Sequence, residues 1–104
     1  INLDLDMMEI LEREIDGKDI YEARNIVHRV LKEGEFNLVH QYEFKKVGVL
    51  DRLVERYVYS DNYNLIIVDF GQEYEQVGES YHPYYYMNVQ VVDEDVSYIY
   101  HEFY

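Results

Sequence analysis

Apolar residues recur at helical spacing near the start of the chain. Within residues 4–17 they stand three or four positions apart, a spacing that places side chains on one face of a helix. Asp6 with Glu9 three residues later matches a capping pair, and Gly17 is a common helix end. The pattern predicts a first helix capped by Asp6. Its buried stripe comprises Met8, Leu11 and Ile15.

A second helix is predicted from Asp19 to Gly34. Asp19 has an N-cap side chain, and Glu22 completes the capping pair. Gly34 follows the last apolar position of the run. Few residues separate the two helices, so they should be neighbours in space. The buried stripe comprises Ile20, Ala23, Ile26, Val27, Val30 and Leu31.

After the second helix, the spacing of apolar residues changes from helical to alternating. Over residues 36–44 one set of alternate positions is largely apolar or aromatic, which is typical of a half-buried strand. The positions of that face are Phe36, Leu38, His40, Tyr42 and Phe44.

Residues 49–57 fit two kinds of element. Leu50, Leu53, Val54 and Tyr57 lie on one face of a helix, and we predict a short helix here. The stretch LVERYVYS also fits the beginning of a strand, and the pattern leaves that alternative open.

Two hairpins are predicted in the C-terminal half. The first turns at 60–62, where Ser, Asp and Asn favour a turn. Its second strand, residues 65–70, is the most apolar of the chain and should be central. Residues 71–80 are predicted as a loop or weak edge strand, and the second hairpin, 84–103, turns on Asp93–Asp95.

Helices and strands that segregate along a chain indicate an α+β fold. We predict two N-terminal helices packed on a roughly four- to five-stranded antiparallel sheet. The 104 residues suit a single domain over 1–104.

Charge and tyrosine are both unevenly distributed. The formal net charge is −13. Residues 1–56 hold 13 acids and all 9 bases, whereas 57–104 hold 9 acids, no base and 11 of the 13 tyrosines. Phosphate contacts need Lys or Arg, so this half argues against direct binding of nucleic acid or an anionic membrane. An acidic field attracts basic partners instead.

Alternation along the last hairpin separates two faces. The residues expected to point into the core are Tyr85, Met87, Val89, Val91, Ile99 and Phe103. Those expected on the other face are Tyr84, Tyr86, Asn88, Gln90, Tyr98 and Tyr100, joined by Tyr57 and Tyr59. Tyrosine is common at protein interfaces because it buries a rigid ring and keeps a hydroxyl group. It is also a good strand residue, so a tyrosine-covered sheet that is scaffold alone remains an alternative.

Acids near these tyrosines are candidates for contacts with Lys and Arg. Same-face positions on a strand are about 7 Å apart, the order of the spacing between successive phosphates. We expect carboxylates that imitate phosphates, from a pool that also includes Asp69. The candidate partner-binding residues are Asp61, Glu73, Glu75, Glu79, Tyr84, Tyr86, Asp93, Glu94, Asp95, Tyr98, Tyr100 and Glu102.

Catalytic and metal-binding motifs are weak in this sequence. There is no Cys, and the four histidines, at 28, 40, 82 and 101, lack metal-ligand spacing. No serine lies in a nucleophile motif, and the scattered glycines form no phosphate loop. We predict no catalytic residue, no metal and no cofactor.

In size, acidity and lack of cysteine the chain resembles small phage-type inhibitors that mimic DNA, the anti-restriction, anti-CRISPR and uracil-glycosylase-inhibitor proteins. The resemblance covers composition and no motif, so it assigns no residue a role. It implies a non-catalytic inhibitor that binds a basic nucleic-acid-binding protein, such as a nuclease or a CRISPR or restriction effector, and blocks its nucleic-acid site.

Two alternatives remain. One is an immunity protein or antitoxin that neutralises a basic nuclease toxin. The other is a structural or interaction domain whose acidity serves solubility. The lack of cysteine fits a reducing compartment, and no apolar run approaches the roughly 18 residues that span a membrane. We expect the cytoplasm of a bacterial or phage-infected cell.

Overall fold

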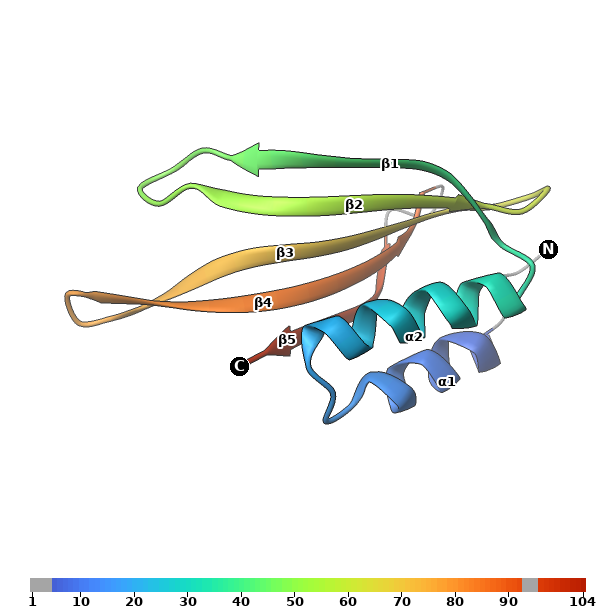
Figure 1. The fold of residues 1–104 in the computed structure, drawn as a ribbon, viewed down its shortest axis with the longest axis horizontal. Coiled ribbons are helices and arrows are strands. Elements are labelled where there is room, and N and C mark those ends of the chain that lie inside the picture. Colours follow the sequence, from blue (N-terminus) through green and yellow to red (C-terminus); the bar gives the residue numbers. More distant parts are fainter. Residues whose placement is uncertain (1–4, 93–95) are drawn as a thin grey trace.

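The computed structural model describes residues 5–92 and 96–104, with side chains from Met7 to Val92 and from Ile99 to Tyr104. Two helices precede a five-stranded antiparallel sheet, and both lie against one face of it (Figure 1). The predicted α+β arrangement is confirmed. The elements are α1 (Leu5–Ile15), α2 (Ile20–Glu33), β1 (Asn37–Lys46), β2 (Arg52–Ser60), β3 (Leu65–Val77), β4 (Ser80–Val91) and β5 (Val96–Phe103).

Both helices are amphipathic. In α2 the Asp19 side chain accepts a hydrogen bond of 2.9 Å from the Glu22 amide, as the predicted cap requires, and Gly34 ends the helix. The cap predicted for α1 is wrong, because that helix begins before Asp6 and includes it. Gly17, with φ of 74°, adopts a left-handed conformation that glycine takes without strain, and the chain turns there. The buried positions are Met7, Met8, Leu11 and Ile15 in α1, and Ile20, Ala23, Val27, Val30 and Leu31 in α2, with Ile26 partly buried.

Each strand pairs with the next one along the chain, so β3 is central, as its apolar run predicted. Residues 71–80 were predicted as a loop or weak edge strand, and this is wrong. They form the end of β3, a tight turn at Gly78 and the first residue of β4. Residues 71–77 all have a register partner on β4. These residues are polar because this hairpin extends past the helices, so no helix covers it (Figure 1).

The short helix predicted over 49–57 is also wrong, since most of this stretch lies in β2. Val54 and Tyr57 are both buried and stand three positions apart, a spacing that also occurs on one face of a helix. In the strand they point to opposite faces: Tyr57 belongs to the core cluster and Val54 does not. Hydrogen bonding to β1 on one side and β3 on the other decides the conformation.

The strand predicted at 36–44 exists as β1, but it is not half-buried. Its residues are mostly exposed. Phe36 lies just before the strand and packs in the core, whereas Leu38 is 45% exposed. The reason is that the helices pack on β2 to β5, and no described β1 side chain belongs to the core cluster.

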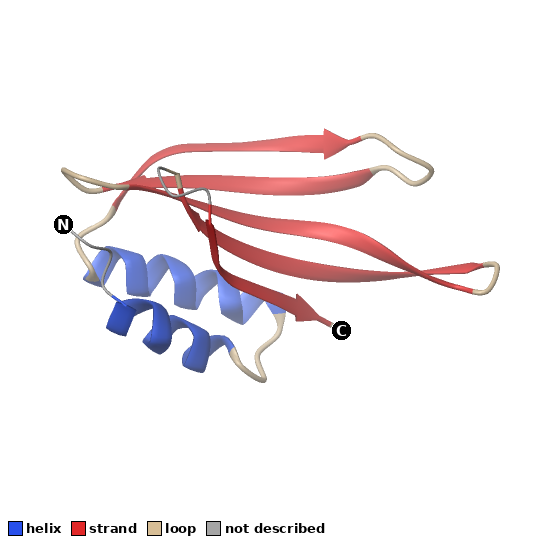
Figure 2. Ribbon diagram, turned by 180° about the vertical axis from the view of Figure 1, so that it is seen from behind, coloured by secondary structure: helices blue, strands red, loops and turns tan. Residues whose placement is uncertain are grey.

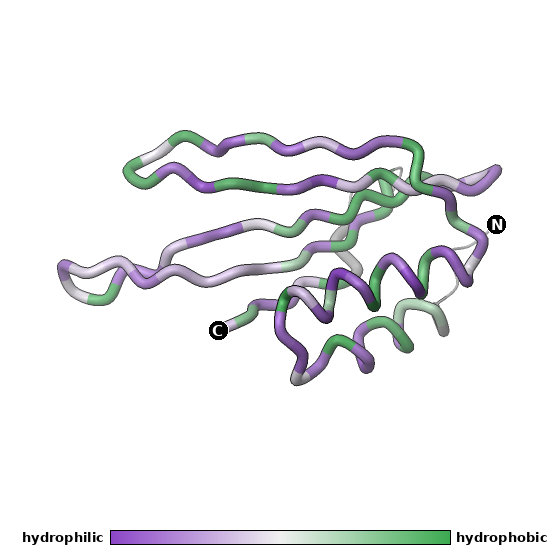
Figure 3. Tube along the Cα trace, in the orientation of Figure 1, coloured by the Kyte–Doolittle hydropathy of each residue, from purple (hydrophilic) through white to green (hydrophobic). Residues whose placement is uncertain are grey.

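The core lies between the helix pair and one face of the sheet (Figure 2). Apolar residues concentrate there, while the projecting β3–β4 hairpin is mostly polar or intermediate in hydropathy, with one hydrophobic stretch near its tip (Figure 3). The other sheet face carries no helix, and we call it the open face. The sheet residues of the core are Tyr57, Tyr59, Ile66, Val68, Phe70, Met87, Val89, Val91, Ile99 and Phe103.

Within residues 5–92 and 96–104, neither helix combines the length and the apolar character that a membrane span requires.

Candidate protein-binding surface

The open face carries side chains that the strand register aligns in rows. On β3, Glu73 lies opposite Tyr84 and Gly71 lies opposite Tyr86. On β5, Glu102 lies opposite Tyr86 from the other side. The predicted alternation therefore holds for the central part of β4. Its core side chains are Met87, Val89 and Val91.

Three other tyrosines do not lie where the sequence placed them. Tyr57 and Tyr59 were expected on the open face but lie in the core, opposite Val68 and Ile66. Tyr85 was expected in the core but is 45% exposed, although its register partner Phe103 belongs to the core cluster. Alternation gives which residues share a face within one strand, whereas the face that Tyr57 and Tyr59 share with the other strands depends on the register with β3.

Tyr86 is a packed residue of the open face. It is 6% exposed, and its ring lies over Gly71. Lys46 donates a hydrogen bond of 3.2 Å to the Tyr86 hydroxyl, and the Lys46 Nζ lies 5.6 Å from the ring centroid. Tyr86 therefore offers a partner little surface.

Two of the predicted acids are neutralised by bases from β2. Arg56 donates two hydrogen bonds of 2.8 Å to Asp69, and this bonding raises the pKa of Arg56. Arg52 lies 3.6 Å from Glu73. The guanidinium of Arg56 also lies 5.0 Å from the Phe44 ring centroid. Antiparallel pairing thus places bases of the first half beside acids of the second, and the open face is not uniformly acidic.

A second set of side chains forms a more exposed part of the open face. We call Glu75, Tyr84, Tyr100, Glu102 and Tyr104 the tyrosine–carboxylate surface. The rings of Tyr84 and Tyr104 stack with centroids 5.3 Å apart, and Tyr100 stacks on Tyr86 at 5.7 Å. The Tyr104 hydroxyl donates a hydrogen bond of 2.6 Å to Glu102 Oε2.

The electrostatics of this surface raise the pKa values of two of its phenols, Tyr100 and Tyr104. The hydrogen bond to Glu102, with slight desolvation and nearby negative charge, raises the pKa of Tyr104 to about 12. Burial, then the neighbouring Tyr84 and Glu102, raises the pKa of Tyr100. Tyr100 is 53% exposed and Tyr104 is 87% exposed. Among the described residues, neither Glu75 nor Glu102 forms an ion pair.

Two further predicted residues, Asp61 and Glu79, lie apart from this surface. Asp61 accepts backbone hydrogen bonds of 2.7 Å from Tyr63 and 2.6 Å from Asn64, which lower its pKa and stabilise the β2–β3 turn. Glu79 is exposed in the β3–β4 turn, at the other end of the sheet (Figure 1). Outside the described residues are Asp93, Glu94 and Asp95 and the side chain of Tyr98.

Sequence reasoning missed Tyr104. It lies one residue beyond β5, yet it continues the alternation through Tyr100 and Glu102 and contacts both the carboxylate and the Tyr84 ring. Extending the period-two pattern to the last residue would have found it.

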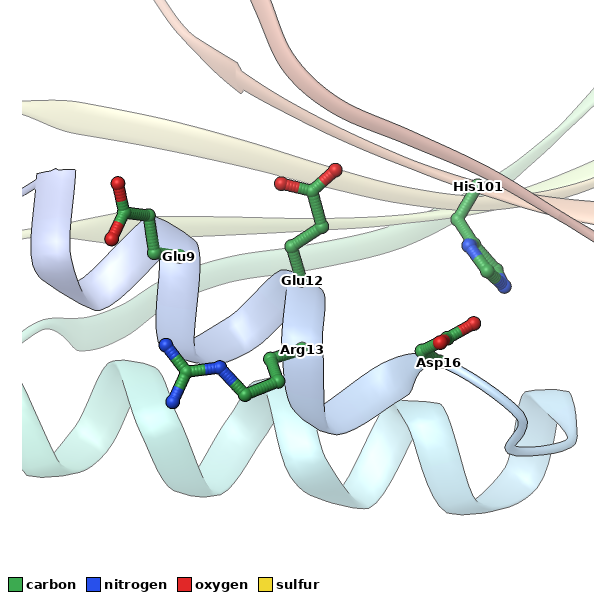
Figure 4. Close-up of a pocket in the computed structure, with 5 residues that line it drawn as sticks. All are labelled: Glu9, Glu12, Arg13, Asp16 and His101. Atoms are coloured by element: carbon green, nitrogen blue, oxygen red, sulfur yellow. The ribbon is translucent and has the colours of Figure 1, made fainter.

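An acidic row on α1 was also missed. Glu9, Glu12 and Asp16 are spaced as on one helix face, and they line a hollow beside His101 of β5 (Figure 4). Figure 4 shows Glu12 and Asp16 on the side of α1 toward His101, while Arg13 points away along the helices. The helical spacing of the three acids was the signal. The row lies on the other side of β5 from the tyrosine–carboxylate surface.

A polar network also joins α2 to the sheet. His28 Nδ1 is hydrogen-bonded to the Tyr59 hydroxyl, and the His28 ring meets the Tyr57 ring edge-on at 4.7 Å. The Tyr57 hydroxyl donates to Glu55, which forms an ion pair of 2.8 Å with Arg24. Burial lowers the pKa of His28 and raises that of Tyr59 to about 12. These contacts hold the helix on the sheet, while the Nε atom of Arg24 is buried with no hydrogen-bond partner among the described residues.

Across the described part of the chain, no group of three or more His, Cys, Asp or Glu residues is arranged to hold a metal ion. No known protein family, curated protein or solved structure matches this chain.

Proposed function

We propose that this protein is a non-catalytic inhibitor that binds a basic nucleic-acid-binding protein through the tyrosine–carboxylate surface and blocks its nucleic-acid site. The observation that carries the proposal is the exposed pair of Tyr100 and Tyr104 beside Glu102, a carboxylate without an ion-pair partner among the described residues.

The chemistry of this surface suits an arginine or lysine side chain. Phenol faces attract guanidinium and ammonium groups, and a neighbouring carboxylate adds charge-assisted hydrogen bonds. Large, rigid rings that become desolvated on binding are common energetic anchors of interfaces. The ion pairs of Asp69 and Glu73 leave these two acids less available, so the contacts fall to Glu75 and Glu102.

Competition with nucleic acid follows from the partner's chemistry. A protein that binds nucleic acid presents Lys and Arg to the phosphates, and those same side chains would meet the carboxylates here. The acidic field of residues 57–104 would speed encounter with such a surface, and salt would slow it.

The test is capture from a lysate of the native host at low and at high salt, with mass spectrometry of the retained proteins. A Tyr104→Ala/Glu102→Gln variant is compared with a matched Tyr21→Ala/Glu33→Gln variant, which removes an exposed tyrosine and an exposed acid from α2. We expect a basic nucleic-acid-binding protein that is retained by wild type and by the α2 variant, released by high salt, and lost from the Tyr104→Ala/Glu102→Gln variant.

The captured protein is then assayed for nucleic-acid binding with increasing amounts of this chain. Loss of binding at a stoichiometric ratio is expected, with recovery when nucleic acid is added in excess. A partner whose nucleic-acid binding is unchanged, or equal capture by both variants, would contradict the proposal. A toxin nuclease as the captured protein would identify the inhibitor as an immunity protein.

A further inference from the structure

One edge of the sheet is open at β5. This strand pairs with β4 and has no second strand neighbour among the described residues. The outer edge of such a strand presents backbone N–H and C=O groups that can accept another strand. In Figure 2, β5 is the last strand of the sheet on its side.

Acidic groups lie on both sides of this edge. On the open face, Tyr100 and Glu102 lie on β5, and Tyr104 continues their row one residue beyond the strand. On the other face His101 lies beside a hollow of α1 that is lined by three acids, Glu9, Glu12 and Asp16, and by one base, Arg13 (Figure 4). The three acids near this edge, Glu12, Asp16 and Glu102, form no ion pair with any described residue.

The opposite edge, at β1, differs in charge and in shape. Lys45 and Lys46 stand at the end of that strand, and its register shifts between Leu38 and His40. Lysines and irregular pairing are common protections of an edge strand. Lys45 lies 3.8 Å from Asp51, and Lys46 reaches across the open face to the Tyr86 hydroxyl. The two edges therefore differ for a basic partner mainly in the irregular register of β1 and in the acids without ion pairs beside β5.

We infer that the β5 edge takes an extended, arginine- or lysine-rich segment of the partner as a sixth strand. The inference rests on the proposed function and adds how the partner is held. Backbone hydrogen bonds to β5 supply affinity, and alternate side chains supply specificity.

Alternation sends the side chains of an added strand to both faces. Those on the open face meet Tyr100 and Glu102. Those on the other face meet the hollow of Glu12 and Asp16. A basic segment is therefore complementary on both faces, whereas a segment that lies flat on the open face uses only one of them.

The test uses a synthetic peptide with arginine at every third position and valine or threonine between, so that its arginines fall alternately on the two faces. The control is the same peptide with N-methyl groups at each valine and threonine, which keeps the charge and removes strand pairing from both of its edges. We expect the control to bind at least about tenfold more weakly, because several backbone hydrogen bonds are lost. Amide exchange should slow along β5 and not along β1.

Substitutions on each face complete the design. Glu102→Gln and Glu12→Gln/Asp16→Asn should each weaken the unmodified peptide, while Glu33→Gln on α2 should not. Equal binding of the two peptides, or protection of β1 in place of β5, would overturn the edge inference and leave the proposed function standing. Failure of both peptides to bind would instead count against the proposed function itself.

Discussion

The ring of Tyr86 lies across Gly71 of the neighbouring strand, so close that a Cβ atom at position 71 would come within 2.4 Å of the Tyr86 hydroxyl oxygen. The two residues are register partners on the open face. Glycine in the middle of a strand leaves a gap, and the Tyr86 ring fills it. A stack on Tyr100 and a hydrogen bond from Lys46 hold the ring there.

Gly71→Ala should therefore displace the Tyr86 ring and lower the free energy of unfolding by about 1–3 kcal/mol, the range for overpacking a tight site. Urea unfolding measures this change. The control is the double variant Gly71→Ala/Tyr86→Ala, which should be little less stable than Tyr86→Ala alone, because the clash is gone. Additive losses in the double variant would show that the ring and the glycine are independent.

Arg56→Met should cost more than any other single ion-pair substitution in the described chain. It leaves the carboxylate of Asp69, whose side chain is 12% exposed, without its partner. The loss should approach, without reaching, the roughly 3–5 kcal/mol of a fully buried pair, since the Arg56 side chain is 30% exposed. Arg29→Met is the matched control, because its pair with Glu14 is well exposed and should contribute at most about 1 kcal/mol. Similar losses for both would mean that water reaches Asp69 freely.

Leu31→Ala tests the core beneath α2. Leu31 is fully buried, and its truncation should lower the free energy of unfolding by roughly 2–5 kcal/mol. Ile10→Ala, at a position 44% exposed on α1, should cost much less. Chemical denaturation of both variants measures their free energies of unfolding. Equal losses would show that Leu31 is not part of the core.

The two helices were predictable because their apolar stripes follow one period from start to end, and in α2 the cap Asp19 marks the beginning. β2 was not, since its buried Val54 and Tyr57 face opposite sides and the spacing alone imitates a helix. Only pairing with β1 and β3 separates the two interpretations.

The candidate surface was predictable only as far as a local pattern along one strand could show it. Alternation within β4 and β5 gave the open-face positions of Tyr84, Tyr86 and Tyr100. It gave no information on which residues lie across from them. The pairing of Arg56 with Asp69 and the position of Tyr86 over Gly71 depend on register between strands, which no local pattern contains.

His28 should make stability depend on pH. Burial, then the charge of Arg24, lowers its pKa below the ordinary 6.5, so the unfolded state binds the proton more readily than the folded state. The free energy of unfolding should be highest above about pH 6.5 and fall as pH drops through the lowered pKa of the folded state. In the neutral tautomer with its proton on Nε2, Nδ1 accepts from the Tyr59 hydroxyl, and protonation removes that lone pair.

The measurement is the difference in unfolding free energy between wild type and His28→Gln from about pH 8 to pH 5, the range in which histidine titrates. Differences between the two proteins cancel the titration of the many carboxylates. The wild type should lose its advantage toward pH 5, and His82→Gln on the projecting hairpin should keep the wild-type slope. A pH-independent difference would show that the His28–Tyr59 contact does not sense protonation.

Glu102→Gln should lower the pKa of the Tyr104 phenol from about 12 toward the ordinary value of 10.0. The hydrogen bond from the protonated phenol to the carboxylate and the charge of that carboxylate both disfavour phenolate, and the substitution removes the charge. Nuclear magnetic resonance of ring-labelled tyrosine, titrated with base, resolves this group from the others. Glu79→Gln, an exposed acid at the far hairpin turn, is the control and should leave the titration unchanged. If Tyr104 titrates alike in all three proteins, the phenol and the carboxylate are not joined in solution, and the tyrosine–carboxylate surface loses the contact that orders it for a partner.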